Sequence, residues 1–539
     1  MVHSVHMTHS WLLLLGMATA EAATFQDILN GSRMVTWSTD TELSRRRRQS
    51  QPVSSRAVRR MQRVATPIDP SGWPDRFPAK DHCSKCGLCE TSFGIQRVVE
   101  SCAFLNDGMS RIDTLEANVH GRRRDPQLTW SIDNRSKARA VDEARFGVMH
   151  EPMKLARGVG MEDAQWTGIV TSIAVAMLEA GEVDAVVCIA SDSQGEDDTG
   201  RSTRLWSSPK PILAKTKEQI LEGRGVKPAL APSLNVLDLI RSDSSIRRLL
   251  FCGVGCSVQA FRAVQNDLIR ESKHLQEVFV LGTNCVDNSP TPAAADKFLT
   301  EGVKIDSSLV GNPRGYEFMQ DFRVHVKTDS GAYVTKPYFC LPGTIAESSI
   351  ATSCLACTDY CNALTDVTVG YMGAPLSYDN REGNIPRMDQ SLQTLTIRNP
   401  RGAKMVQLAI DAGRLEIMGD VPKSDNGIGH EKMAIQTVTA DSIVLAMIGG
   451  TVPEEGMPQW LGEALALVIR RFVAPKGINF ARYSIDYHIL RNYLHMVDAW
   501  GEERARESMP QFARDVVDHY VETQAEMANL VSKVKRNRF

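Results

Sequence analysis

The spacing of the cysteines constrains this chain more than any other feature of its sequence. Twelve cysteines occur among 539 residues, and most of them gather in a few short motifs. Disulfide-rich proteins are usually small secreted domains without a sizeable core, whereas 42% of this chain is hydrophobic. The clustering therefore favours thiolate-bound metal over disulfides.

The first group is Cys83-Ser-Lys-Cys86-Gly-Leu-Cys89, with Cys102 thirteen residues further on. The C-x2-C-x2-C spacing lets one tight loop place several thiolates around a 4Fe-4S cluster. A zinc site is the alternative, although zinc sites more often pair two separated C-x2-C hairpins. Cys102 is followed by Ala103 and not by the proline of the usual ferredoxin motif, so its place in this cluster stays open.

A second group combines two parts of the chain. Cys354 and Cys357 have C-x2-C spacing, while Cys256 and Cys285 each follow a predicted strand, at 248–251 and 277–281. Because strand ends of an α/β sheet lie at one edge, these four thiolates can converge on a second cluster. Cys252 is a possible substitute ligand. Three further cysteines are interpreted as structural: Cys188, Cys340 and Cys361.

A candidate flavin-binding loop precedes a predicted helix at 172–180. A glycine flanked by hydroxyls at a helix N-terminus leaves backbone N–H groups free for an anionic pyrophosphate. Many helices begin with Thr-Gly for no functional reason, and a solvated side chain is the ordinary interpretation of a lone lysine. The candidate flavin contacts are Gln165, Trp166, Thr167, Gly168, Thr171, Lys227, Pro228, Ser233 and Asn235.

The length of the chain predicts about three or four folding units. The apolar run at 11–20 and the Ser-, Thr- and Arg-rich stretch after it are typical of a two-part leader into a chloroplast, with simple secretion as the alternative. No other segment approaches the roughly 20 apolar residues of a spanning helix. The net charge of -2 points to no nucleic-acid partner.

The expected fold is α/β, with a mixed-sheet flavin-binding core, a ferredoxin-like iron–sulfur segment before it and a helical region after it. The expected segments are a signal peptide at 1–24, a plastid transit-like region at 25–75, the N-terminal iron–sulfur segment at 76–160, the flavin-binding α/β domain at 161–300, a domain with the second cluster cysteines at 301–450, and the helical region at 451–539.

Longer matches identify a family. They are both cysteine groups, the Trp166-Thr167-Gly168 loop, Gly253-Val254-Gly255-Cys256, and Asp359 to Gly370 followed by Tyr371-Met372-Gly373. Together they resemble the beta-subunit family of deazaflavin-dependent (coenzyme F420) hydrogenases and dehydrogenases, from about residue 78 to 510. The chain departs from the pattern at Ser257 and Cys361, and in extra polar segments near 194–207 and 376–390.

Within that family, the chain looks most like a ferredoxin-dependent branch that reduces chlorophyll pigments. Asn284 and Tyr487 favour reduction of a 7-hydroxymethyl group to give chlorophyll a. The alternative is reduction of the 8-vinyl group of a divinyl (proto)chlorophyllide. Two other classes stay open: an electron-transfer subunit of a hydrogenase-like complex, and a zinc-stabilised scaffold without redox function.

The resemblance implies reduced ferredoxin as the electron donor, FAD and two 4Fe-4S clusters. The implied path runs from the cluster of Cys83, Cys86, Cys89 and Cys102, through the cluster of Cys256, Cys285, Cys354 and Cys357, to FAD. A flavin is expected because ferredoxin delivers one electron at a time, while the reduction takes two.

Loss of a hydroxyl group as water also requires a proton donor. The candidates are Asp366 and Asp287, which lie in the family motifs, and His120 and Asp321. Each is more often a solvated or structural group.

The predicted helix at 460–472 is apolar and contains Arg470 and Arg471 near its end. Membrane-surface contact is one interpretation. A buried amphipathic helix or a subunit interface is favoured, because the charged face is thin. We expect a homo-oligomer with at most peripheral membrane contact.

Overall fold

The computed structural model describes residues 101–104, 108–132, 138–191, 209–376, 386–422 and 427–538, without the side chains of 129–132 and 138–141. The predicted leader and Cys83, Cys86 and Cys89 lie outside the described residues. So do residues 194–207 and 377–385 of the two extra segments. Within the described part, no helix is long and apolar enough to cross a membrane.

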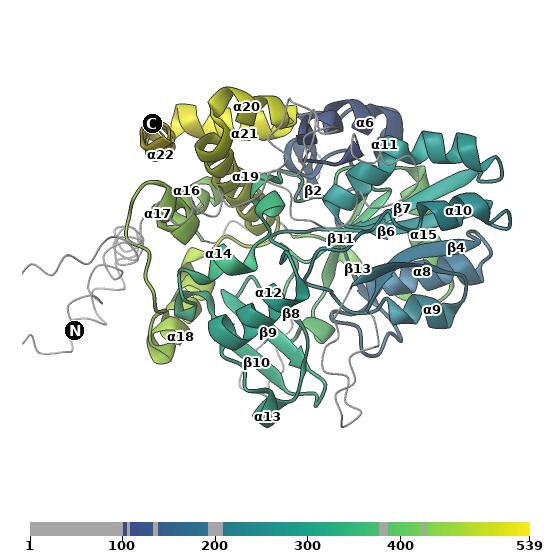
Figure 1. Ribbon diagram of the computed structural model, residues 1–539, viewed down its shortest axis with the longest axis horizontal. Coiled ribbons are helices and arrows are strands. Elements are labelled where there is room, and N and C mark those ends of the chain that lie inside the picture. Colours follow the sequence, from purple (N-terminus) through teal and green to yellow (C-terminus); the bar gives the residue numbers. More distant parts are fainter. Residues whose placement is uncertain are drawn as a thin grey trace, which may run out of the picture.

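An eight-stranded mixed sheet forms the centre of the molecule (Figure 1). Its strand order is β13-β3-β12-β11-β7-β6-β4-β5, in which β4, β6, β7 and β11 run parallel. These parallel strands are almost continuously apolar, as expected for strands covered on both faces. The strands are β3 Lys154–Gly158, β4 Ala185–Ala190, β5 Lys210–Ala214, β6 Arg248–Gly253, β7 Glu277–Thr283, β11 Val367–Gly370, β12 Gln393–Ile397 and β13 Leu415–Asp420.

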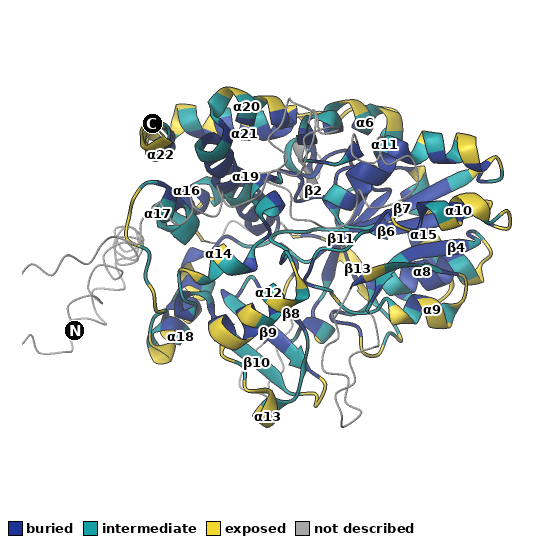
Figure 2. Cartoon of the chain, viewed as in Figure 1, coloured by how far each residue is buried: buried dark blue, intermediate teal, exposed yellow. Residues whose placement is uncertain are grey.

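Helices cover both faces of this sheet. On one face, Ile173 of α8 and Met405 of α15 share a hydrophobic cluster with Leu250 of β6. On the other face, Phe261 of α11 joins the larger core. Figure 2 shows buried strands between helices whose outer sides are exposed. The covering helices are α6 Ile112–His120, α8 Ile169–Glu179, α9 Lys217–Glu222, α10 Leu237–Ser242, α11 Gly255–Ser272 and α15 Pro400–Asp411.

The C-terminal region is helical, as predicted. The buried helix α19 is its axis and contacts α16, α17, α20, α21 and α22. The helices of this region are α16 His430–Ala440, α17 Ser442–Met447, α18 Gln459–Val468, α19 Ile478–Trp500, α20 Glu502–Ser508, α21 Gln511–Thr523 and α22 Ala525–Arg538, with a π-helix, η7, at Ile469–Val473.

A three-stranded antiparallel sheet of β8 Pro313–Phe318, β9 Arg323–Thr328 and β10 Tyr333–Pro337 forms a separate layer. The short helices α12 Pro292–Lys297, α13 Ser307–Val310 and α14 Ile345–Ser349 lie near it in the chain (Figure 1). A two-stranded sheet pairs β1 Thr129–Ile132 with β2 Ala138–Asp142, and the one-turn helix α7 Glu143–Phe146 follows it.

The structure confirms two parts of the predicted fold class: the mixed-sheet α/β architecture and the helical C-terminal region. The large sheet takes β3 from the segment predicted at 76–160, four strands from 161–300 and three from 301–450. The large sheet is therefore one continuous unit that extends across the predicted boundaries at 160 and 300. Strand order in a sheet depends on contacts between distant parts of the chain, which local sequence patterns do not reveal.

The predicted burial of the helix at 460–472 holds on one side only. Leu465 and Ala466 join the core. Trp460 and Phe472 are 72% and 71% exposed, and Leu467 is 49% exposed.

Asp366, the residue just before β11, joins both faces of the large sheet. One carboxylate oxygen accepts hydrogen bonds from Arg262 of α11 at 3.3 Å and from Arg401 of α15 at 3.0 Å. It also accepts from the Asn399 amide at 2.8 Å, while the other oxygen accepts from the Val280 N–H of β7 at 2.7 Å. Although burial opposes ionisation, the two guanidinium groups hold the pKa of this carboxyl below its usual range.

We expect Asp366→Asn to lower the free energy of unfolding by about 3 kcal/mol or more, because it leaves Arg262 buried without its counter-charge. Since the folded-state pKa is depressed, this stabilisation is present at neutral pH and is lost as the pH falls below the ordinary value of 3.8. Denaturant unfolding at neutral and acidic pH measures both effects. The control is Asp411→Asn, which removes an exposed carboxylate at the end of α15. Equal stability of the two variants would contradict the assigned role of Asp366.

Candidate functional site

A cavity of about 2030 Å³ lies at the carboxyl ends of the parallel strands. Its wall includes Gly253 at the end of β6, Thr283 at the end of β7 and Gly370 at the end of β11. This edge is where open α/β sheets bind ligands. Pockets for single small ligands usually enclose about 300–1,000 Å³, so this volume accommodates more than one ligand.

The loop before α8 forms one end of the cavity. Gly168 is the N-cap of α8 and has a φ of 81°, in the left-handed region that favours glycine. A Cβ atom there would also lie 2.4 Å from the Cβ of Met161, so a side chain does not fit. The sequence predicted this loop and the helix after it, and the structure starts the helix three residues earlier, at Ile169.

Most of the predicted flavin contacts face the cavity: Gln165, Trp166, Gly168, Thr171, Lys227, Pro228 and Ser233. Thr167 and Asn235 are outside its wall. The Thr167 hydroxyl accepts a hydrogen bond from the Gly158 N–H at 3.0 Å and so fixes the loop, while Asn235 is exposed. Burial lowers the pKa of Lys227 to about 8, and its amine donates to the carbonyl oxygens of Arg224 and Gly225.

The four cysteines of the second predicted group surround a small cavity of about 40 Å³ that shares wall residues with the large one. Cys256 lies in the first turn of α11 and Cys285 follows β7. Cys354 and Cys357 lie in and just after the 3-10 helix η5 Thr352–Ala356. The structure thus brings together four thiols from three separate parts of the chain.

A side chain from the interior of α19 holds the two cysteines of η5 in place. The Asn492 amide donates hydrogen bonds to the carbonyl oxygens of Cys354, at 3.0 Å, and Cys357, at 2.6 Å. The preceding residue, Arg491, forms a two-bond ion pair with Asp287. These contacts link the helical region to the cysteine site.

The donor set fits an iron–sulfur cluster. Four thiols around one space are the ligands that a 4Fe-4S cluster takes. Burial raises the pKa of Cys354 to about 12, so these thiols depend on a bound metal to be ionised. Within the described residues, no three His, Cys, Asp or Glu side chains are close enough to share one metal ion. A cluster of several irons holds its thiolates further apart than one ion would.

The other described cysteines divide as follows. Cys102 lines the large cavity and packs against the main core, but its three predicted partners lie outside the described residues. Cys340 and Cys361 are both buried, and Cys361 belongs to the main core cluster. Cys188 and Cys252 face the same cavity from the neighbouring strands β4 and β6.

Three of the predicted proton donors lie outside the cavity wall. Asp366 is held in the ion-pair network described above. The Asp321 carboxylate pairs with His325 at 2.9 Å and with Arg323 at 3.3 Å. His120 is hydrogen-bonded to the Ala363 carbonyl oxygen, and burial lowers its pKa to about 4. All three side chains are thus bound to other protein groups outside the cavity wall.

The fourth predicted donor, Asp287, does line the cavity. Its two oxygens accept hydrogen bonds from Arg491, both at 2.7 Å. Despite burial, this guanidinium holds the pKa of Asp287 below its usual range. The carboxylate is therefore ionised near neutral pH and has no proton to donate.

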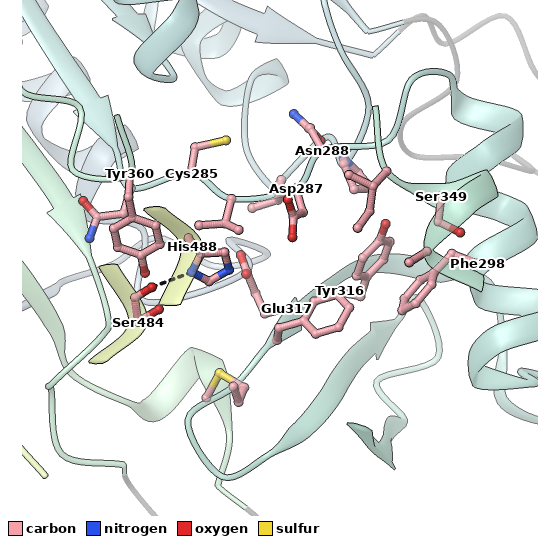
Figure 3. Close-up of a pocket in the computed structure, with 18 of the residues that line it drawn as sticks. Cys285, Asp287, Asn288, Phe298, Tyr316, Glu317, Ser349, Tyr360, Ser484 and His488 are labelled. Atoms are coloured by element: carbon pink, nitrogen blue, oxygen red, sulfur yellow. Dashed lines mark hydrogen bonds between the residues drawn. The ribbon is translucent and has the colours of Figure 1, made fainter. Parts of the chain in front are cut away.

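Glu317 of β8 was not predicted, and it lines the cavity with its carboxyl group directed inward (Figure 3). Burial raises its pKa to about 7. The Gln165 amide donates to one carboxyl oxygen at 3.0 Å. No motif marks Glu317, and the available signal was weak: an acidic residue between Tyr316 and Phe318 in a short strand.

Comparison with known proteins agrees with this arrangement. Models of the coenzyme F420 hydrogenase/dehydrogenase beta subunit match the chain, the N-terminal model over residues 158–238 and the C-terminal model over 246–423. The chloroplastic 7-hydroxymethyl chlorophyll a reductase of Oryza sativa is 43% identical to the chain, over 87% of this chain and 88% of that protein. The chain belongs to the coenzyme F420 hydrogenase/dehydrogenase beta-subunit family.

Two further proteins are similar to the chain. An uncharacterized Nostoc protein is 35% identical over 83% of this chain and 95% of that protein. A chain of the F420-reducing [NiFe] hydrogenase complex of Methanosarcina barkeri matches with 22% identity and a TM-score of 0.40, over 50% of this chain and 83% of that chain. The two family models include the loop before α8, the four clustered cysteines and Glu317.

Proposed function

We propose that the chain is a ferredoxin-dependent iron–sulfur flavoprotein that reduces 7-hydroxymethyl chlorophyll a to chlorophyll a in plastids. The observation that carries this proposal is the junction of the four-cysteine site with the large cavity that the loop before α8 also lines. The Oryza relative, 43% identical and named a chloroplastic 7-hydroxymethyl chlorophyll a reductase, supports the substrate and the location.

The residues would divide the task as follows. Cys256, Cys285, Cys354 and Cys357 would hold one 4Fe-4S cluster. The N–H groups at the start of α8 and the Lys227 amine would bind the pyrophosphate of FAD. When bound, these groups supply one-electron transfer and its conversion into two-electron reduction.

The volume of the cavity favours an enzyme over a subunit that only passes electrons. An electron-transfer subunit needs space for its flavin alone, whereas about 2030 Å³ leaves room for a second large ligand. The outer part of the wall is formed by the loop at 451–458 and by Leu461 of α18. The expected homo-oligomer and peripheral membrane contact stay predictions, and the exposed Trp460, Leu467 and Phe472 mark a surface that either would cover.

Turnover with chemically or enzymatically reduced ferredoxin tests the function. We expect the holoenzyme to convert 7-hydroxymethyl chlorophyll a into chlorophyll a, as detected by pigment chromatography, and to leave divinyl chlorophyllide unchanged. Conversion of the divinyl pigment alone would assign the 8-vinyl substrate. If neither pigment changes, the proposed reductase function is wrong.

The cluster assignment predicts the iron content of cysteine variants. Cys285→Ser should lose the iron of one of two clusters, about half of the total, together with part of the visible absorption. The matched control is Cys340→Ser, which changes a buried cysteine outside both cavities and should keep all its iron. Full iron content in Cys285→Ser would overturn the assignment.

The flavin assignment predicts a difference between two glycines with positive φ. Gly168→Ala places a methyl group against Met161 and displaces the start of α8, so the purified protein should retain much less FAD. Gly160→Ala has a similar backbone conformation, with a φ of 67°, but no atom lies within 4 Å of the added Cβ. It should therefore retain FAD as the wild type does. Equal FAD content, measured after release from the protein, would contradict a flavin site at this loop.

A further inference from the structure

We propose that Glu317 is the catalytic acid that protonates the hydroxyl group of the substrate as it leaves as water. This inference rests on the proposed function and adds to it the residue that completes the reaction. Of the four donors predicted from the sequence, three lie outside the cavity wall, and both carboxylate oxygens of the fourth, Asp287, are bound by Arg491.

The first argument is the position of Glu317 in the wall. Gln165, from the loop before α8, donates to its carboxyl group at 3.0 Å. The Tyr371 hydroxyl, after β11, lies 3.5 Å from its other oxygen. Tyr371 also stacks on Trp166, with ring centroids 4.6 Å apart. Glu317 therefore lies directly against the loop that would bind the flavin.

The second argument is that the same carboxyl group faces the cysteine side of the cavity. Glu317, Cys285 and Tyr360 line the same cavity. Figure 3 shows it directed into the space that Asp287 and His488 also line. A substrate reduced by a flavin at the loop would have to enter this space, so its reacting group would come within reach of Glu317.

The third argument concerns three other titratable groups of this wall, Asp287, His488 and Lys227. Both carboxylate oxygens of Asp287 accept hydrogen bonds from Arg491. Burial lowers the pKa of His488 to about 4, so its imidazole is neutral. The Lys227 amine is bound to two backbone carbonyl oxygens near Cys188.

The surroundings of Glu317 keep its carboxyl group protonated to an unusually high pH. Burial raises its pKa to about 7, while hydrogen bonds from Trp166, Tyr371 and Gln165 oppose this rise only in part. The other ionisable groups around Glu317 are Cys285, Tyr316, Tyr338 and Tyr360. None of these side chains can carry a positive charge, so none of them lowers the pKa of Glu317 by charge attraction. An acid with a pKa near the working pH is the most effective proton donor.

The reaction then balances. The Glu317 O–H bond breaks and its proton goes to the hydroxyl oxygen of the substrate. The C–O bond breaks, and its electron pair leaves with the water molecule. The carbon receives a hydride equivalent, two electrons and one proton, from the reduced flavin that the proposed function supplies, which forms the C–H bond of the methyl group. Glu317 is left as a carboxylate and regains a proton from water.

The test separates flavin reduction from pigment reduction in the holoenzyme. Glu317→Gln keeps the size of the side chain and its place beside Gln165 but has no acidic proton. We expect the flavin of this variant to be reduced by ferredoxin at the wild-type rate and the pigment to bind with wild-type affinity. Oxidation of the reduced enzyme by the pigment should slow by about 100-fold or more. Glu317→Asp, with a shorter acid, should recover part of this rate.

A second readout does not depend on activity. Because the folded-state pKa of Glu317 is about 7 and its ordinary value is 4.5, the unfolded chain loses this proton first. The wild-type melting temperature should therefore contain a decrease between about pH 4.5 and 7 that Glu317→Gln lacks. The matched control is Glu416→Gln, at an exposed carboxylate of β13 paired with Arg157, which should behave as the wild type in both experiments.

Two outcomes would overturn the inference: pigment oxidation of reduced Glu317→Gln within threefold of the wild-type rate, or a parallel loss of rate in Glu416→Gln. Failure of the proposed function can be told apart from failure of this inference, because in that case the wild-type enzyme itself would convert neither pigment.

Discussion

The ion-pair network of Asp366 is the interaction on which the rest of the structure depends. One buried carboxylate joins α11, α15, β7 and β11. Helices on opposite faces of the sheet are thereby held to its two central strands, and the ends of those strands carry Cys285 and the wall of the cavity. Because a buried charge is stable only with its partners in place, the network fixes how the two faces lie relative to one another.

A second ion pair connects this frame to the helical region. Arg491 binds Asp287 just after β7, and the neighbouring Asn492 binds the carbonyl oxygens of Cys354 and Cys357. α19 therefore closes the cysteine site and one side of the large cavity at once. The family models end at residue 423, so this closure is made by a part of the chain that they do not include.

Much of the candidate site was predictable from local patterns. Cys354 and Cys357 are close in sequence, and Cys256 and Cys285 follow strands, so their convergence followed from the geometry of parallel strands. The acid–base residues were not predictable in this way. Asp366, Asp321 and His120 looked functional because their residue types are reactive. Asp366 and His120 are bound by partners far away in the sequence, and Asp321 is bound by Arg323 and His325 close to it in the chain. Glu317 carried no motif, and only the fold places it against Gln165 and Tyr371.

The sequence by itself determined the ligand types, the glycine that begins α8 and the alternation of strands and helices, because spacing, backbone conformation and hydrophobic periodicity are local properties. The tertiary structure alone decided which strands share the sheet, which carboxyl groups are ionised and which one faces the cavity. Those properties depend on burial and on charges brought together from distant segments. A carboxyl group beside two guanidinium groups loses its proton, and one among aromatic rings keeps it.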